Sequence, residues 1–236
     1  MNNDPRYSPL LHSTLDHALQ YLEKLSTAPV GARAGLAELR DRLEGPLPES
    51  EKDALRVIED LVDDVEDGLI GSSGGRFFAW VIGGSVPAAL AADWLTTAWD
   101  QNAGMFAVAP AAAVVEEVVG KWLAELLHLP ASASFALVTG CQMAHVTCLG
   151  AARNAVLARK GWDVEQAGLC GSPPIRVVTG DQRHGTIERA LRMLGLGRGC
   201  IVDIAVDESG GQLTGNALER VLQEGIRSLP PAPGYT

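Results

Sequence analysis

SFALVTGCQMAH, residues 134–145, is the stretch of sequence that decides the fold we expect for this chain. The apolar run Ser134–Val138 is predicted to be a buried strand, and Gly140 after it predicts a tight turn into a helix. At such a turn the backbone N–H groups of the first helical residues, including Cys141 and Gln142, face outward at the positive end of the helix dipole. The stretch therefore predicts an anion-binding turn.

The side chains of this turn are compatible with a phosphate site but do not require one. Thr139 and Gln142 carry donors that could add hydrogen bonds to a phosphate. The GxxxxGK pattern of nucleotide-binding loops is absent, and so is the GxGxxG pattern of dinucleotide-binding turns. An ordinary strand-to-helix turn, in which Gly140 only permits close packing, explains the same residues equally well and stays open at this point.

Strands and helices alternate from this stretch toward the C-terminus. Apolar runs at 175–178 and 200–206 are predicted strands, and helices are predicted at 142–160, 186–194 and 214–227. This spacing is typical of an α/β fold with a mostly parallel sheet flanked by helices. Because the alternation stops at the end of the chain without a closing element, we expect a sheet that is incomplete at the C-terminus.

The region before the decisive stretch is predicted to be helical. Helices are expected at 12–24, 34–43, 51–69, 87–101 and 111–127. Ser50 is the expected N-cap of the third of these helices. At Gly71 the predicted pattern changes from helices alone to alternating strands and helices. We therefore expect an N-terminal helical segment over 1–70, suited to subunit contact, and a larger α/β domain over 71–236.

His184 is the second candidate for a ligand-binding side chain. It follows the predicted strand 175–178 and precedes the helix 186–194, at the carboxyl edge where parallel α/β sheets bind ligands. A loop histidine or a helix N-cap without a ligand explains its position as well. Cys141 could be a nucleophile at a helix N-terminus, but no His or Asp partner stands at an interpretable spacing.

Composition argues against several classes of protein. The chain has 29 acidic and 19 basic residues, a net charge of −10, and no Lys/Arg patch of the kind that binds nucleic acid. The longest apolar run, around 106–115, is too short to span a bilayer, and no signal-peptide pattern opens the chain. Four cysteines without CxxC spacing predict neither a zinc site nor a disulfide framework. We expect a soluble cytoplasmic protein with no metal, nucleic-acid or membrane partner.

Four segments, in order along the chain, resemble the group II pyridoxal-phosphate (PLP) dependent amino-acid decarboxylases, the family of aromatic-L-amino-acid and glutamate decarboxylases. The segments are RFFAWVIGGSVPAALAADWLTTAWDQN (76–102), APAAAVVEEVVGKWL (109–123), VTGCQMAHVTCLGAAR (138–153) and DQRHGTIERA (181–190). The resemblance covers about residues 50–236. Each segment alone would be weak, and their shared order makes the resemblance specific.

The resemblance implies a PLP-dependent transferase-like fold, the aspartate aminotransferase fold type I, with PLP as cofactor. It implies that Gly140, Cys141 and Gln142 hold the cofactor phosphate and that the catalytic His184 lies on the pyridine ring. It also implies a substrate pocket bordered by Trp80, Val81, Ile82 and Gly83. This sequence departs from the family in two places. Cys141-Gln142 replaces small side chains in the phosphate turn, and Gly74-Gly75-Arg76 replaces the usual His-Pro.

The resemblance further implies that the chain stops before the Schiff-base lysine. None of its four lysines follows a predicted strand at the carboxyl edge of the sheet: Lys24, Lys52, Lys121 and Lys160. We therefore expect the N-terminal half of a carboxy-lyase of amino-acid metabolism that acts on a small-molecule L-amino acid. We expect this enzyme to be a homodimer when intact and inactive as this piece alone. Three alternatives stay open: a PLP-dependent aminotransferase-like enzyme, a truncated non-catalytic remnant that acts as a binding or interaction module, and an unrelated α/β transferase or phosphate-ester enzyme.

Overall fold

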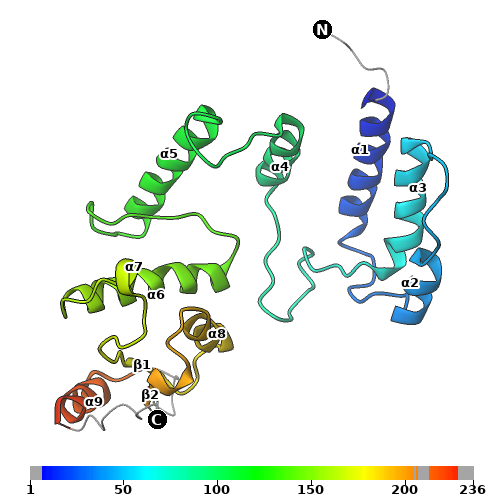
Figure 1. Ribbon diagram of the computed structural model, residues 1–236. Helices are drawn as coiled ribbons and strands as arrows, with labels where there is room; N and C mark the ends of the chain where they lie inside the picture. The colour runs from blue at the N-terminus through cyan, green and yellow to red at the C-terminus, as the bar shows by residue number, and fades with distance from the viewer. Residues whose placement is uncertain (1–6, 205, 207–212, 228–236) are drawn as a thin grey trace. The chain divides into compact units, whose positions relative to one another are not determined.

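The computed structural model describes residues 7–204, 206 and 213–227. Contacts between residues divide the chain into two units, Met1–Asn102 and Ala103–Thr236, which are described separately (Figure 1). The sequence pattern predicts a domain boundary at residue 70. The contacts instead group the segment 71–102 with the first unit. No helix among the described residues is both long and apolar enough to cross a membrane.

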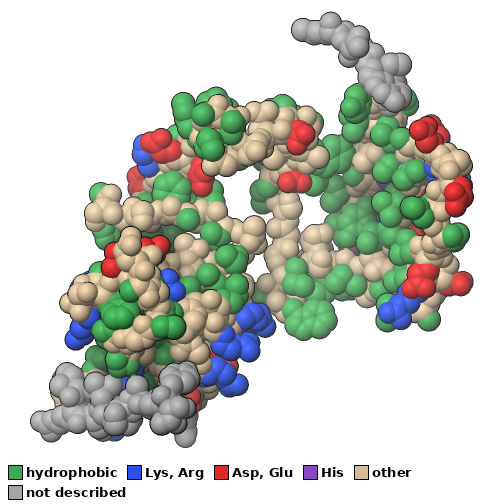
Figure 2. All heavy atoms as spheres, in the orientation of Figure 1, with side chains coloured by type: hydrophobic (Ala, Val, Ile, Leu, Met, Phe, Trp, Pro, Cys, Tyr) green, Lys and Arg blue, Asp and Glu red, His purple; other side chains and the backbone are tan. Residues whose placement is uncertain are grey.

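The N-terminal unit is helical, as the periodicity of its apolar residues predicts. Its helices are α1 (Tyr7–Lys24), α2 (Leu36–Leu43), α3 (Ala54–Val65), the 3-10 turn η1 (Glu66–Gly68) and α4 (Pro87–Trp99). Helix α3 packs against both α1 and α2. The apolar stripe of α1 stays largely exposed on Leu11, Leu15, Leu19 and Leu22. Figure 2 shows hydrophobic side chains gathered over the helices of this unit.

The start of α3 corrects one sequence-based prediction. Ser50 was the expected N-cap, but the helix begins at Ala54 with Asp53 as its cap. The Asp53 carboxylate accepts a hydrogen bond from the Arg56 backbone N–H at 3.2 Å. Asp and Ser are both good N-caps, so local preference alone does not choose between them.

We expect Asp53→Ala to lower the free energy of unfolding by about 1 kcal/mol, because a first-turn N–H then loses its partner. Ser50→Ala is the matched control and should change stability by less than about 0.5 kcal/mol, as for an ordinary surface position. Urea denaturation followed by circular dichroism measures both. Equal destabilisation by the two substitutions would contradict the assignment of the cap to Asp53.

The second unit alternates helices and strands. Its elements are α5 (Pro110–Leu126), α6 (Cys141–Ala158), α7 (Val164–Ala167), β1 (Val177–Gly180), α8 (Gly185–Met193), the 3-10 turn η2 (Arg198–Cys200), β2 (Ile201–Ile204) and α9 (Gly215–Arg227). Each predicted helix of this region is confirmed to within a few residues. Thr214 caps α9, its hydroxyl accepting from the Ala217 N–H at 3.3 Å. The short helix α7 lies between the predicted helix 142–160 and the predicted strand 175–178, where no element was predicted.

Strands β1 and β2 form a parallel pair, which confirms the predicted direction of the sheet. Val177 lies opposite Ile201, and Gly180 opposite Ile204. The predicted strand Ser134–Val138 is wrong for this structure, because these residues form no strand. A strand needs a neighbour that supplies ladder hydrogen bonds, and within the described residues only β1 and β2 pair. The strand predicted over 200–206 ends at Ile204, and residue 205 lies outside the described residues.

Helices α6 and α8 pack against each other (Figure 1), and their contacts join N-terminal end to N-terminal end and C-terminal end to C-terminal end. Near their N-termini, the Gln142 side chain reaches Thr186 of α8. Near their C-terminal ends, Arg153 Nη1 donates to the Leu194 carbonyl at 3.0 Å. Leu157 of α6 and Leu191 of α8 are the largest fully buried side chains among the described residues. Parallel packing brings the two helix N-termini to the same end of the unit.

Candidate functional site

The turn that begins α6 has a backbone conformation that only glycine adopts easily. Gly140 is the residue before the helix, with φ 148° and ψ 177°. For L-residues with a side chain this region costs about 1–3 kcal/mol. No side chain caps the helix, so the N–H groups of Cys141, Gln142 and Met143 face the turn without a side-chain acceptor. An uncapped start of an 18-residue helix offers hydrogen-bond donors to an anion.

The Gln142 side chain is already engaged in the structure. Its Nε2 donates to the Thr186 carbonyl at 3.3 Å, and its Oε1 accepts from Arg189 Nη1 at 3.1 Å. The sequence suggested that this amide could bind a phosphate. In the structure it links α6 to α8 instead, so any phosphate contact of Gln142 rests on its backbone N–H.

His184 is the N-cap of α8. Its Nδ1 accepts from the Thr186 backbone N–H at 3.3 Å and lies 2.9 Å from Thr186 Oγ1. A ring nitrogen that accepts carries no proton, which leaves the proton of the neutral ring on Nε2. These contacts fix the orientation of an imidazole that is otherwise exposed. The histidine is thus both a helix cap and an oriented ring.

The turn at Gly140 and the ring of His184 are neighbours through one shared contact. Thr186 holds the imidazole on one side and receives the Gln142 amide on the other. Both lie at the carboxyl end of β1, because α8 begins five residues after that strand ends and α6 starts beside α8. Two aligned helix dipoles therefore present their positive ends together. The structure thus places the turn at Gly140 near His184, and the binding roles of both stay predictions.

Arg183 and Arg189 are site residues that the sequence did not single out. Arg183 donates to Asp203 of β2 and, at 2.7 Å, to Glu188 of α8, and its side chain is only 14% exposed. It ties the segment that carries His184 to the sheet. Arg189 donates to Gln142 Oε1 and forms no ion pair with any carboxylate in the described part of the chain. Arg189 stands one helical turn after Thr186, so the two share a helix face, and this spacing was the signal in the sequence that could have identified Arg189 as a site residue.

The predicted substrate-pocket residues, Trp80 to Gly83, belong to the N-terminal unit. They lie in a turn before α4, where Trp80 and Val81 have φ of 55° and 52°. Both side chains are exposed. A left-handed conformation is unusual for a β-branched residue. The assignment of this segment to a substrate pocket stays a prediction.

The remaining reactive side chains of the described residues make no second centre. All four cysteines are free, and Cys141, Cys148 and Cys170 are exposed. Burial raises the pKa of the Cys200 thiol, which donates to the Gly197 carbonyl at 3.2 Å. Residues 7–204, 206 and 213–227 contain no group of three His, Cys, Asp or Glu side chains placed to hold a metal ion.

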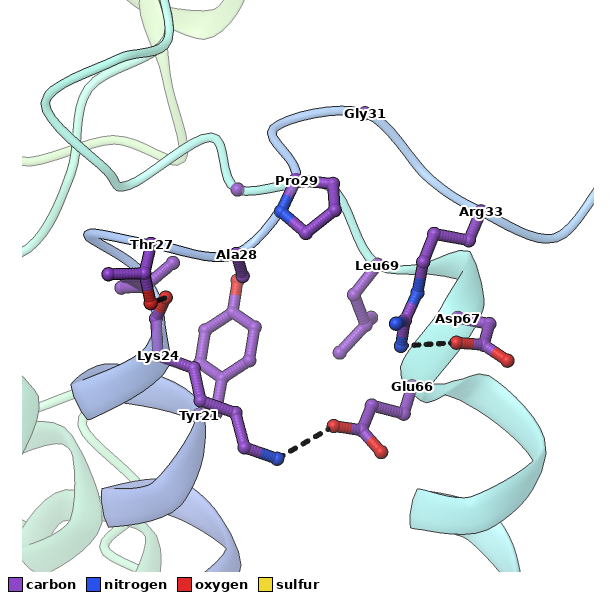
Figure 3. A pocket seen from close by; sticks show the side chains of 12 residues that line it. Tyr21, Lys24, Thr27, Ala28, Pro29, Gly31, Arg33, Glu66, Asp67 and Leu69 are labelled. Carbon is purple, nitrogen blue, oxygen red and sulfur yellow. Dashed lines mark hydrogen bonds and ion pairs between the residues drawn. The ribbon is translucent and has the colours of Figure 1, made fainter.

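A cavity of about 320 Å³ in the N-terminal unit differs in character from the turn at Gly140 (Figure 3). It lies between the end of α1 and η1, and ion pairs neutralise its cations. Lys24 Nζ lies 3.1 Å from Glu66, and Arg33 lies 2.5 Å from Asp67. Tyr21 donates to the Ile70 carbonyl at 3.4 Å. Both of these cations are thus paired with carboxylates, in contrast to the uncapped N–H groups at Gly140.

The geometry at Gly140 fits one end of a phosphorylated aromatic molecule. The turn supplies uncapped backbone donors, and the Gly140 conformation keeps the backbone open to a ligand, because an added Cβ there would meet no atom within 4 Å. The neighbouring imidazole supplies a flat, oriented surface for an aromatic ring. A phosphate ester with a planar ring matches both features.

Comparison with known proteins points to one family. A family model described as the pyridoxal-dependent decarboxylase conserved domain matches residues 37–230. An aromatic-L-amino-acid decarboxylase of Bacillus atrophaeus is 28% identical over 90% of this chain and 42% of its own length. Tryptophan decarboxylase 1 of Oryza sativa subsp. japonica is 28% identical over 78% of this chain and 37% of its own. The chain thus spans about two fifths of the length of these relatives.

Solved structures agree in fold. The crystal structure of mouse CSAD has a TM-score of 0.84 and 23% identity, covering 95% of this chain and 47% of that one. The crystal structure of Oryza sativa TDC with PLP has a TM-score of 0.81 and 25% identity, covering 96% of this chain and 49% of that one. The arrangement of helices and strands described above is therefore one that larger enzymes share.

Proposed function

This chain belongs to the pyridoxal-dependent decarboxylase family, and we propose that it forms the phosphate- and ring-binding part of a PLP-dependent amino-acid decarboxylase. The observation that carries the proposal is the juxtaposition of the uncapped turn at Gly140 with the oriented ring of His184. The fold is the PLP-dependent transferase-like fold type I, in agreement with the solved structures. The family and its solved members make PLP the cofactor.

The residues of this chain would bind and orient the cofactor. The backbone N–H groups that begin α6 would hold the phosphate, helped by the dipoles of α6 and α8. His184 would lie against the ring, with its orientation set by Thr186. When bound, PLP supplies an electron-withdrawing ring that stabilises the charge left by a departing carboxylate. Each of these roles concerns binding and orientation.

The amine that anchors the cofactor is not supplied by a lysine beside this turn. Lys160 follows the C-terminal end of α6, and an 18-residue helix separates it from Gly140 by about 27 Å. Lys121 pairs with Glu117 at 2.5 Å, and Lys24 and Lys52 pair with Glu66 and Asp60. An ammonium held by a carboxylate is a poor nucleophile. We propose that the chain alone binds the cofactor reversibly and does not turn over.

The proposed substrate is an L-amino acid, since the matched family and the named relatives are amino-acid decarboxylases. An aminotransferase is not favoured by these matches. An interaction module without catalysis would keep the same cradle. Such a module differs from our proposal in one measurable property. It would bind PLP and inorganic phosphate with equal affinity, because the PLP ring would make no favourable contact with His184.

We also propose a homodimer in the cytoplasm as the working form. The exposed apolar stripe of α1, on Leu11, Leu15, Leu19 and Leu22, supports a covered surface. Four free cysteines are typical of a reducing compartment and fit a place in amino-acid metabolism inside the cell. Sedimentation equilibrium tests the dimer, and a monomer at all accessible concentrations would contradict it.

Alkylation of Cys141 tests the proposed cofactor site directly. Cys141 is exposed at the turn, and Cys170 is exposed in a loop whose Leu169 lies against Gly195, beyond the C-terminal end of α8. We expect PLP at saturating concentration to slow iodoacetamide modification of Cys141 by about tenfold or more, because the phosphate covers the start of α6. Inorganic phosphate should protect only at higher concentration. Peptide mass spectrometry measures both sites, and equal or absent protection of Cys141 and Cys170 would overturn the proposal.

A further inference from the structure

We propose that Arg189 is a positioning residue that holds the phosphate turn and the His184 ring at the spacing a phosphorylated ring requires. The inference rests on the proposed function, because the turn and the ring are taken to be its two contact points. Arg189 acts through the Gln142 side chain and does not itself contact the cofactor. The linked side chains of Arg189 and Gln142 and the carbonyl of Thr186 form a bridge between α6 and α8.

Each link of the bridge is a direct contact. Arg189 Nη1 donates to Gln142 Oε1 at 3.1 Å, and Gln142 Nε2 donates to the Thr186 carbonyl at 3.3 Å. Thr186 in turn donates its backbone N–H to His184 Nδ1 at 3.3 Å. Gln142, Thr186 and His184 therefore connect the first turn of α6 to the imidazole, and Arg189 of α8 holds the Gln142 amide at the start of this path. Gln142 is the second residue of α6, so a shift of its side chain also moves its backbone N–H at the start of the helix.

The bridge holds the end of the helix pair that matters for a ligand. The other end is held by Arg153 and the Leu194 carbonyl, at 3.0 Å, and by the close approach of Gly150 to the Leu194 side chain. With only that second anchor, the N-terminal ends of α6 and α8 could separate while the buried core around Leu157 and Leu191 stayed packed. Such a change alters the spacing between the turn and the ring and leaves each contact point intact.

Arg189 is suited to this role by its chemistry. A guanidinium has several donors in a fixed fork, so one can hold an amide oxygen in a defined direction. In the described part of the chain no carboxylate competes for it, in contrast to Arg183, which Glu188 and Asp203 hold. A hydrogen bond from a charged donor is among the stronger ones in proteins.

The test compares two ligands that differ only in the need for correct spacing. Inorganic phosphate needs the turn alone, whereas PLP needs the turn and the ring. In the 236-residue chain, Arg189→Met should weaken PLP binding about tenfold and change the dissociation constant of inorganic phosphate by less than about threefold. Arg192→Met is the matched control, because it removes the same charge one turn further along α8, and it should change neither.

A double-mutant cycle with Gln142→Ala separates positioning from direct contact. If Arg189 acts only through Gln142, adding Arg189→Met to Gln142→Ala should weaken PLP binding by less than about twofold more. Independent tenfold losses would show that Arg189 contacts the cofactor and would overturn the positioning role. An equal loss for phosphate and PLP in Arg189→Met would do the same, as would unchanged PLP binding in both single variants.

The outcome also distinguishes this inference from the proposed function. If the unmodified chain binds PLP no better than inorganic phosphate, the proposed ring contact itself is wrong. If the unmodified chain prefers PLP and the Arg189 and Gln142 variants keep that preference, only the inference about Arg189 fails. Circular dichroism melting curves accompany each titration. Arg189 is exposed, so its replacement should leave the melting temperature close to that of the Arg192 control.

Discussion

Gly140→Ala is expected to weaken the binding of both PLP and inorganic phosphate by about tenfold to a hundredfold. Gly140 has φ 148° and ψ 177°, a region that costs about 1–3 kcal/mol for a residue with a side chain. The added Cβ would meet no atom within 4 Å, so the penalty comes from the backbone alone. The chain can relieve the strain only by changing the turn, which moves the N–H groups that begin α6 away from the anion.

The control for this substitution is Gly199→Ala. Gly199 also has open space around a new Cβ, but its φ is not positive. It should therefore leave both dissociation constants within about twofold. Isothermal titration with phosphate and absorbance titration with PLP measure the two constants. Unchanged binding in Gly140→Ala would show that the turn tolerates a side chain and that the phosphate binds elsewhere.

His184→Asn and His184→Ala are expected to separate the two tasks of this residue. Asparagine is a good N-cap and can accept from the Thr186 N–H, so His184→Asn should keep the stability of α8. Alanine cannot accept this hydrogen bond and should lower the free energy of unfolding by about 1 kcal/mol. Both variants lose the aromatic surface, which is worth about 0.5–1.5 kcal/mol for an aromatic pair, so both should bind PLP up to about tenfold more weakly.

Inorganic phosphate supplies the comparison that makes this prediction sharp. It does not use the ring, so His184→Asn should bind it as the unmodified chain does. PLP affinity that falls only in His184→Ala would mean that the histidine matters as a cap and not as a ring. Denaturant unfolding and absorbance titration on the same samples decide between these outcomes.

Some of the candidate site could be predicted from the sequence because its signals are local. The glycine after the apolar run, the helix that follows and the position of His184 between strand and helix are readable from spacing alone. The order of the four family-like segments was also visible, and the family match over residues 37–230 confirms the resemblance. The parallel direction of β1 and β2 followed from the helix between them.

Other features could not be predicted because they depend on partners far along the chain. The segment Ser134–Val138 has the composition of a strand, yet no described neighbour pairs with it. Helix α3 begins at Ala54 with Asp53 as its cap in place of Ser50, although both residue types are good caps. The Gln142 amide was a candidate phosphate ligand until the fold brought Thr186, 44 residues away, within 3.3 Å.

The sequence by itself determined which residues can bind an anion and which can cover a ring, because glycine conformation and helix polarity act over a few neighbouring residues. Only the tertiary structure decided that the two lie together, since parallel packing of α6 on α8 places Gln142 against Thr186 and Arg189. Helix packing joins residues more than forty positions apart, and a pattern read along one chain contains no information about that contact.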